Sequence, residues 1–256
     1  MKIRRDGFTL IELAVALFVL MLLLSSIVVP LTTRVEQRKI SDTRRALDEA
    51  RDALMGFAAA NGRLPCPASA TSNGNESFAA GGSTANGSCS NFFDGFLPAA
   101  ALGLTATDSQ GYALDGWGLV QNRIRYAVSN QTVNSITNPL TRTSGMSSVG
   151  LSNLAAAQFL YVCNSGSGVT AGTNCGTAVA LASNAMAILY SVGPNAATGG
   201  TGTDEAENPN PNGGSADRIF VSHDQSSGTG AEFDDIVTWI GTSPLFNRMI
   251  AAGQLP

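Results

Sequence analysis

The sequence predicts an α+β fold in which a long N-terminal helix, membrane-spanning in its first part, packs on a C-terminal antiparallel β-sheet domain. Three observations support this class. An apolar run covers residues 8–31, an amphipathic pattern of helical period continues to residue 61, and short strand-like segments separated by hairpin-length loops follow. The alternating strands and helices of a doubly wound sheet are absent from the pattern, which favours α+β.

The apolar run at residues 8–31 predicts a membrane helix. Its 24 residues include one charged residue, Glu12, and at about 1.5 Å per residue they are long enough to cross a bilayer core. The basic residues that precede it favour a cytoplasmic start of the chain. No small-residue cleavage site follows Val29, so we expect the helix to stay attached. Pro30 removes a helix hydrogen bond, and we expect a kink or local melting near residues 26–30.

The helix is expected to continue beyond the apolar run and to end near Asn61, because Gly62 and the prolines that follow disfavour helix. Its apolar positions recur at three- and four-residue steps and predict one buried stripe: Ile40, Thr43, Leu47, Ala50, Leu54 and Phe57. The pairs Arg44–Asp48 and Arg45–Glu49 have the spacing of helical ion pairs. The alternative is a coiled-coil dimer, but Thr and Ala in the stripe suit a zipper poorly.

After the helix, residues 68–90 have the Ala, Ser, Gly and Asn composition of a loop. Aromatic and β-branched residues then predict strands, at residues 123–128, 159–163, 185–192 and 218–222.

The four cysteines predict disulfide bonds. Their spacing does not fit a zinc site, and the chain has a single histidine. Sequence proximity favours Cys66–Cys89 and Cys163–Cys175 over the other two connectivities. The alternative reading is that all four are buried free thiols of a cytosolic protein.

The charge of the C-terminal part argues against nucleic-acid binding. From Leu64 onward it has 5 Arg and no Lys against 12 Asp and Glu, a formal charge of −7. Phosphate contacts need clustered basic residues.

No enzyme motif is present in the sequence, and we expect no catalytic activity. The chain lacks a Gly-x-Ser-x-Gly elbow, a phosphate-binding glycine motif and a His-Glu-x-x-His motif. His223 and Asp224 lie near serines, but a lone histidine in a Ser/Gly-rich loop is more often a surface residue than part of a triad.

The six residues Gly7-Phe8-Thr9-Leu10-Ile11-Glu12, between a basic leader and an apolar run, resemble the class III signal of type IV pilins and type II secretion pseudopilins. The resemblance implies that a prepilin peptidase cuts between Gly7 and Phe8 and that Phe8 is N-methylated. A carboxylate in an apolar segment is costly without a partner. The family uses such a residue in assembly, which implies that Glu12 pairs with the freed amino group of Phe8 in a neighbouring subunit. The alternative is that Glu12 is solvated near the headgroups.

The C-terminal part more loosely resembles major pseudopilins. Leu64-Pro65, Asp115-Gly116-Trp117-Gly118, residues 191–195 and Asp235-Ile236-Val237-Thr238-Trp239 occur in the family's order. The departures are Gly116 for a proline, Asn195 for an aspartate and a longer insert before Asp234.

In that family the loop binds calcium, and the resemblance makes Asn195, Asp234 and Asp235 the candidate Ca2+ ligands. One carboxylate is lost at Asn195. The insert contains acidic residues that could compensate, although such residues are usually only solvated: Asp204, Glu205, Glu207 and Asp217.

The resemblance implies a precursor with a cleaved leader at 1–7, a helix at 8–61 and a periplasmic globular domain at 62–256. The expected function is that of a filament subunit, a type II secretion pseudopilin in the bacterial inner membrane. Its expected partners are other pilin-like subunits, the prepilin peptidase and the inner-membrane assembly platform. The alternatives are a type IV pilus major or minor pilin, or a membrane-anchored binding module that does not polymerise.

Overall fold

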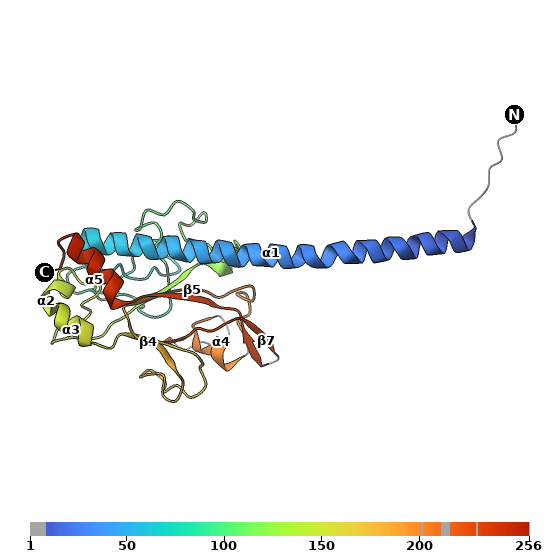
Figure 1. Ribbon diagram of the computed structural model, residues 1–256. Helices are drawn as coiled ribbons and strands as arrows, with labels where there is room; N and C mark the ends of the chain where they lie inside the picture. The colour runs from blue at the N-terminus through green and yellow to red at the C-terminus, as the bar shows by residue number, and fades with distance from the viewer. Residues whose placement is uncertain (1–8, 201, 211–215, 229, 256) are drawn as a thin grey trace. The chain divides into compact units, whose positions relative to one another are not determined.

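The computed structural model describes residues 9–200, 202–210, 216–228 and 230–255, with the side chains of residues 24–32 excepted. The chain divides into two compact units, Met1–Ser41 and Asp42–Pro256, called unit 1 and unit 2 below. The secondary structure is one long helix followed by short strands and short helices (Figure 1). This mixed helix-and-sheet arrangement confirms the α+β class.

Helix α1 extends from Leu10 to Asn61 and ends where the sequence predicts. It stays helical through residues 26–30, so the local melting expected around Pro30 is absent. A proline removes one backbone hydrogen bond, and the turns on either side retain theirs. The Pro30 side chain lies outside the described set.

The described residues of the structure contain no helix with both the length and the apolar character that crossing a membrane requires. The span expected at residues 8–31 lies only in part within the described residues, and it stays a prediction.

Within unit 2, α1 buries the predicted apolar stripe. Thr43, Leu47, Ala50 and Leu54 are almost fully buried, and Ala58 rather than Phe57 continues the buried face. On the outer face Arg45 pairs with Glu49 at 3.8 Å and with Asp42 at 3.5 Å. No ion pair joins Arg44 and Asp48 among the described residues, which corrects that expectation.

A four-stranded antiparallel sheet lies against α1. Its order is β1 (Gly95–Phe96), β2 (Arg125–Val128), β5 (Ala187–Ser191) and β9 (Ile236–Ile240). Side chains alternate between its faces. Tyr126, Val128 and Leu189 pack in one core cluster with Leu47 and Leu54 of α1.

A three-stranded sheet covers the other face of the first. Its order is β4 (Ala180–Ala185), β3 (Leu160–Cys163) and β6 (Ile219–Val221). Ile188 and Tyr190 of β5 pack with Leu160 and Phe220 in a second cluster, so unit 2 has a helix layer and two sheet layers. The β3–β6 pair is parallel, whereas an entirely antiparallel sheet was expected. The connection between these strands contains β4, β5 and α4, and a long crossover permits parallel pairing.

Short elements complete unit 2. The β7–β8 hairpin pairs Ser226–Gly228 with Ala231–Phe233. Four further helices of the described residues are too short to show a clear period in the sequence: η1 (Val120–Asn122), α2 (Gly145–Val149), α3 (Leu151–Ala156) and α4 (Thr203–Glu207). Helix α5 (Thr242–Ala251) is longer and buries Leu245, Phe246 and Met249 on one side, a local pattern from which no helix was predicted. Helices α2, α3 and α5 lie at the end of unit 2 where α1 terminates, whereas α4 and β7 lie toward the end where α1 enters (Figure 1).

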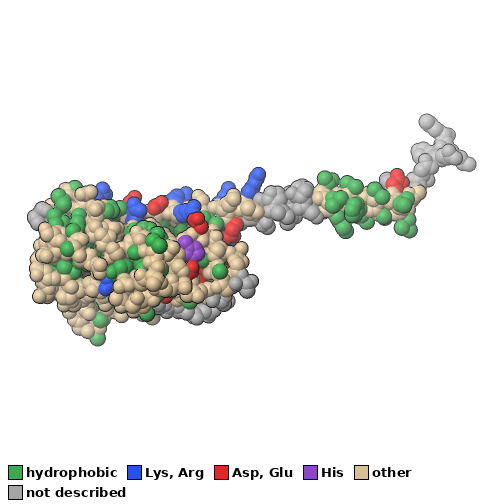
Figure 2. Space-filling model, turned by 60° about the horizontal axis from the view of Figure 1, so that its bottom comes forward, with side chains coloured by type: hydrophobic (Ala, Val, Ile, Leu, Met, Phe, Trp, Pro, Cys, Tyr) green, Lys and Arg blue, Asp and Glu red, His purple; other side chains and the backbone are tan. Residues whose placement is uncertain are grey.

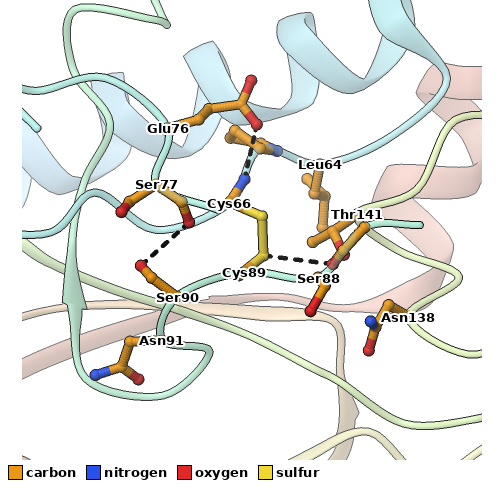
Figure 3. The surroundings of a disulfide bond; sticks show 12 residues. Leu64, Cys66, Glu76, Ser77, Ser88, Cys89, Ser90, Asn91, Asn138 and Thr141 are labelled. Atoms are coloured by element: carbon orange, nitrogen blue, oxygen red, sulfur yellow. Dashed lines mark hydrogen bonds between the residues drawn. A yellow bond between two sulfur atoms is a disulfide. The ribbon is translucent and has the colours of Figure 1, made fainter. Parts of the chain in front are cut away.

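Two disulfides, Cys66–Cys89 and Cys163–Cys175, form the predicted pairing. Cys66 and Cys89 close residues 66–89, which have little regular structure. Around this bond, the Cys66 amide donates to Glu76 and the Ser90 hydroxyl donates to the Ser77 carbonyl (Figure 3). The disulfide therefore fixes the base of a loop that also has its own hydrogen bonds.

Charged side chains are sparse on unit 2. On the face shown in Figure 2, Lys and Arg side chains gather along α1, and most of the remaining surface of unit 2 is uncharged. No cluster of basic side chains is visible on that face away from the helix.

Candidate functional site

Three carboxylates meet in unit 2: Glu205 in α4, and Asp234 and Asp235 in the segment between β8 and β9. One carboxylate oxygen from each lies within 4.8 Å of the others. Glu205 and Asp235 are only 1% and 3% exposed. Ionised carboxylates so close together in a buried place repel one another, so the cluster requires protons or a cation.

Hydrogen bonds fix these side chains. The Glu205 carboxylate accepts from the Asp234 amide at 3.1 Å and from Asn195 Nδ2 at 3.1 Å. Asn208 Nδ2 donates to Asp235 Oδ2 at 2.7 Å. We call Asn195, Glu205, Asp234 and Asp235 the acidic centre.

Gly193 allows the close approach of the loop that leads to Asn195. Its φ is +63°, and a Cβ there would lie 2.2 Å from Asp234 Oδ1. Only glycine combines this backbone conformation with this contact at low cost.

Three oxygens of the acidic centre have no hydrogen-bond partner among the described residues: Oδ1 of Asn195, of Asp234 and of Asp235. Buried acceptors are normally paired, so each of these oxygens requires a donor or a cation that the described residues do not supply. Calcium binds carboxylate and amide oxygens. A set of three carboxylates and one amide oxygen therefore fits such an ion.

The electrostatics agree with a shared cation. Burial, with the nearby Glu205 charge, raises the pKa of Asp234 to about 8. The same causes raise the pKa of Asp235 well above its usual value. Without a cation the acidic centre thus retains protons near neutral pH, and a bound cation would replace them.

A surface groove borders the acidic centre. It has a volume of about 520 Å³ and includes Asp235 in its wall, together with residues from α1, β4, β9 and the segment after β6, among them Arg44, Leu181, His223 and Val237. Asp235, itself 3% exposed, is the member of the acidic centre that borders this groove.

The structure brings together Asn195, Asp234 and Asp235, the residues named from the sequence. Of the four acidic residues in the insert, it adds Glu205 alone. Asp204 accepts from Ser165 and Gly166, and Asp217 accepts from Gly172 and Ile219. Glu207 is outside the cluster, and burial raises its pKa. No sequence signal separates Glu205 from these three, because the choice depends on how α4 packs against β8.

His223 is not arranged as a catalytic base for a serine. Its Nε2 lies 3.0 Å from Asp204 Oδ2, and its Nδ1 lies 2.7 Å from the Asp224 carbonyl oxygen. Phe233 stacks on the ring at 4.0 Å between centroids. Both ring nitrogens are thus engaged, and no serine hydroxyl among the described residues bonds to either.

At the N-terminus, Gly7 and Phe8 lie outside the described residues. Thr9 precedes the first residue of α1, and Glu12 lies in the first turn. The Glu12 amide donates to Thr9 Oγ1, and the Thr9 hydroxyl donates to Glu12 Oε2, both at 3.4 Å. This resembles a helix-capping arrangement, in which an acidic residue also suits the helix dipole.

Residues 2–28 match the family model described as the prokaryotic N-terminal methylation motif. This match supports a type IV pilin-like class III signal at the start of the chain. No curated protein and no solved structure shows significant similarity to the chain.

Proposed function

We propose that this chain is the precursor of a structural subunit in a type IV pilin-like filament, specifically a type II secretion pseudopilin. The observation that carries the proposal is the N-terminal methylation motif at residues 2–28, placed at the start of a 52-residue helix. The prepilin peptidase cuts between Gly7 and Phe8, and Phe8 is then N-methylated. No catalytic role is part of this proposal.

The exposed first part of α1 supports assembly with other subunits. Large apolar side chains along residues 10–23 are exposed in the single chain, including Leu10, Ile11 and Phe18. Left in water, such surface is unfavourable by about 25 cal/mol per Å², so outside a membrane it requires the packed helices of a filament core. Glu12 has a local hydrogen bond to Thr9, and its carboxylate retains acceptor capacity for the amino group of Phe8 in a neighbouring subunit.

In this proposal unit 2 is periplasmic, and the partners are other pilin-like subunits and an inner-membrane assembly platform. A pilus pilin with a role in adhesion, motility or DNA uptake is the second candidate, since the same motif serves both systems. A membrane-anchored module that does not polymerise would tolerate the loss of Glu12, whereas a filament subunit would not.

The processing test is N-terminal mass analysis of protein from its native membrane, with and without the host's prepilin peptidase. We expect a chain that begins at N-methylated Phe8 only when the peptidase is present. Gly7→Ala should abolish cleavage. The control Gly56→Ala lies within α1, where an added methyl meets no other group, and should be processed normally. A mature-size Gly7→Ala product would contradict the proposed site.

We propose further that the acidic centre binds Ca2+ and thereby stabilises unit 2. Asn195, Glu205, Asp234 and Asp235 hold the ion, which neutralises their charge and supplies the missing partners. A ligand at 100 times its Kd stabilises the native state by about 2.7 kcal/mol.

Ca2+ should therefore raise the melting temperature of the full chain in detergent, and a chelator should reverse the rise. Asp235→Asn should remove most of the response. Asp52→Asn, which changes an exposed carboxylate of α1 outside the acidic centre and its groove, is the matched control. An equal response in all three proteins would show that Ca2+ acts elsewhere.

A further inference from the structure

A buried polar network lies beside the acidic centre and involves none of its four ligands. Asp115, Asn122 and Ser191 form it, and each is at most 6% exposed. Asp115 Oδ2 accepts from Ser191 Oγ at 2.5 Å and from Asn122 Nδ2 at 3.0 Å. Asp115 and Ser191 are 76 residues apart in the sequence, so only the fold brings them together.

This network holds Gly193 through both of its backbone polar groups. Asn122 Nδ2 donates to the Gly193 carbonyl at 2.7 Å, and the Gly193 amide donates to Ser191 Oγ at 3.2 Å. Gly193 in turn lies against Asp234, with no room for a Cβ between them. The position of the loop from Gly193 to Asn195, relative to Asp234, therefore depends on Asp115.

Asp115 also stabilises a surface turn that follows it in the chain. Asp115 Oδ1 accepts from the Trp117 amide at 2.9 Å, and the Asp115 carbonyl accepts from Gly118. The turn then presents Leu119 and Val120, which are 52% and 62% exposed. The Gly116 amide donates to Thr43 Oγ1, so the same turn is attached to α1.

We infer that Asp115 is a positioning residue of the acidic centre, and that through it a bound cation orders the turn Trp117–Val120. This inference rests on the proposed Ca2+ site. A cation that draws Asn195 and Asp234 together fixes the Gly193 loop, and the hydrogen bonds of Asp115 transmit this constraint to the turn. Removal of outer-shell partners of metal ligands typically costs 10–100-fold in affinity.

The test uses Trp117 as a reporter. The chain has two tryptophans, so Trp239→Phe leaves Trp117 as the sole indole in the full chain. In this background we expect Ca2+ to shift Trp117 emission and to reduce its quenching by acrylamide. Isothermal titration calorimetry measures Ca2+ affinity in the same samples.

Two variants break the link at different bonds. Asp115→Asn replaces one of the two carboxylate acceptors with an amide donor, so residue 115 can no longer accept both from Trp117 and from the Ser191–Asn122 pair. Ser191→Ala removes one donor with less risk to folding. We expect each to weaken Ca2+ binding about 10-fold and to reduce the Trp117 response at saturating Ca2+ by more than half. Asp52→Asn, on the exposed face of α1, should change neither quantity.

The outcomes separate the two proposals. No measurable Ca2+ binding to the parent protein would overturn the cation site and this inference with it. Normal Ca2+ binding with a full Trp117 response in Asp115→Asn or Ser191→Ala would overturn the inference alone. Weaker binding with a reduced Trp117 response in a variant that melts cooperatively would support the positioning role.

Discussion

Loss of the Cys66–Cys89 disulfide should destabilise unit 2 by an amount that the structure allows us to work out. The bond joins residues separated by 23 positions. The chain-entropy model gives about 3.5 kcal/mol for a closed loop of this length. Since Cys66 is fully buried and Cys89 is 5% exposed, alanine is the suitable replacement at both positions.

The size of unit 2 converts this energy into a melting shift. For a domain of 150–250 residues, about 1 kcal/mol lowers the melting temperature by about 2–4 °C. The double variant Cys66→Ala with Cys89→Ala should therefore melt about 7–14 °C below the parent protein in differential scanning calorimetry.

The second disulfide provides the comparison. Cys163 and Cys175 are separated by 12 positions, and the same model gives about 3 kcal/mol for that loop. Its double alanine variant should show a slightly smaller shift. If loss of Cys66–Cys89 lowered the melting temperature by less than about 2 °C, the entropic argument would be wrong for this loop, and its many local hydrogen bonds would be the main constraint.

Two further predictions concern buried charge. Because the folded-state pKa of Asp234 is raised to about 8, its proton stabilises the cation-free protein below about pH 4, and this contribution is lost as the pH rises through about 8. The melting temperature of Asp234→Asn relative to that of the parent, measured with chelator from pH 4 to 9, should therefore rise with pH. A difference that stays constant over this range would contradict the shifted pKa. Glu76→Ala should cost about 3–5 kcal/mol in urea unfolding, because it leaves Arg63, 2.7 Å from Glu76 and 8% exposed, buried without its partner. Glu49→Ala, which removes an exposed partner of Arg45, should cost less than about 1 kcal/mol, and similar costs for the two would refute the burial argument.

The elements that the sequence predicted well have strong local patterns. The stripe of Leu47, Ala50 and Leu54 has helical period, and these residues are buried as expected. Strands β2, β3, β5 and β6 lie within their predicted segments, because runs of β-branched and aromatic residues are local signals. Short helices such as α4 have too few residues for a period to show, and the crossover that makes β3 and β6 parallel is a property of the whole topology.

The sequence by itself determined the N-terminal signal, the course of α1 to Asn61 and, by proximity, the disulfide pairing, because each depends on residues close together in the chain. Tertiary structure alone decided that Glu205, rather than Asp204, Glu207 or Asp217, joins Asp234 and Asp235. It also decided that Asp115 meets Ser191 beside them. These contacts join segments tens of residues apart, and a carboxylate in a polar loop has no local feature that tells whether packing will bury it or leave it in water.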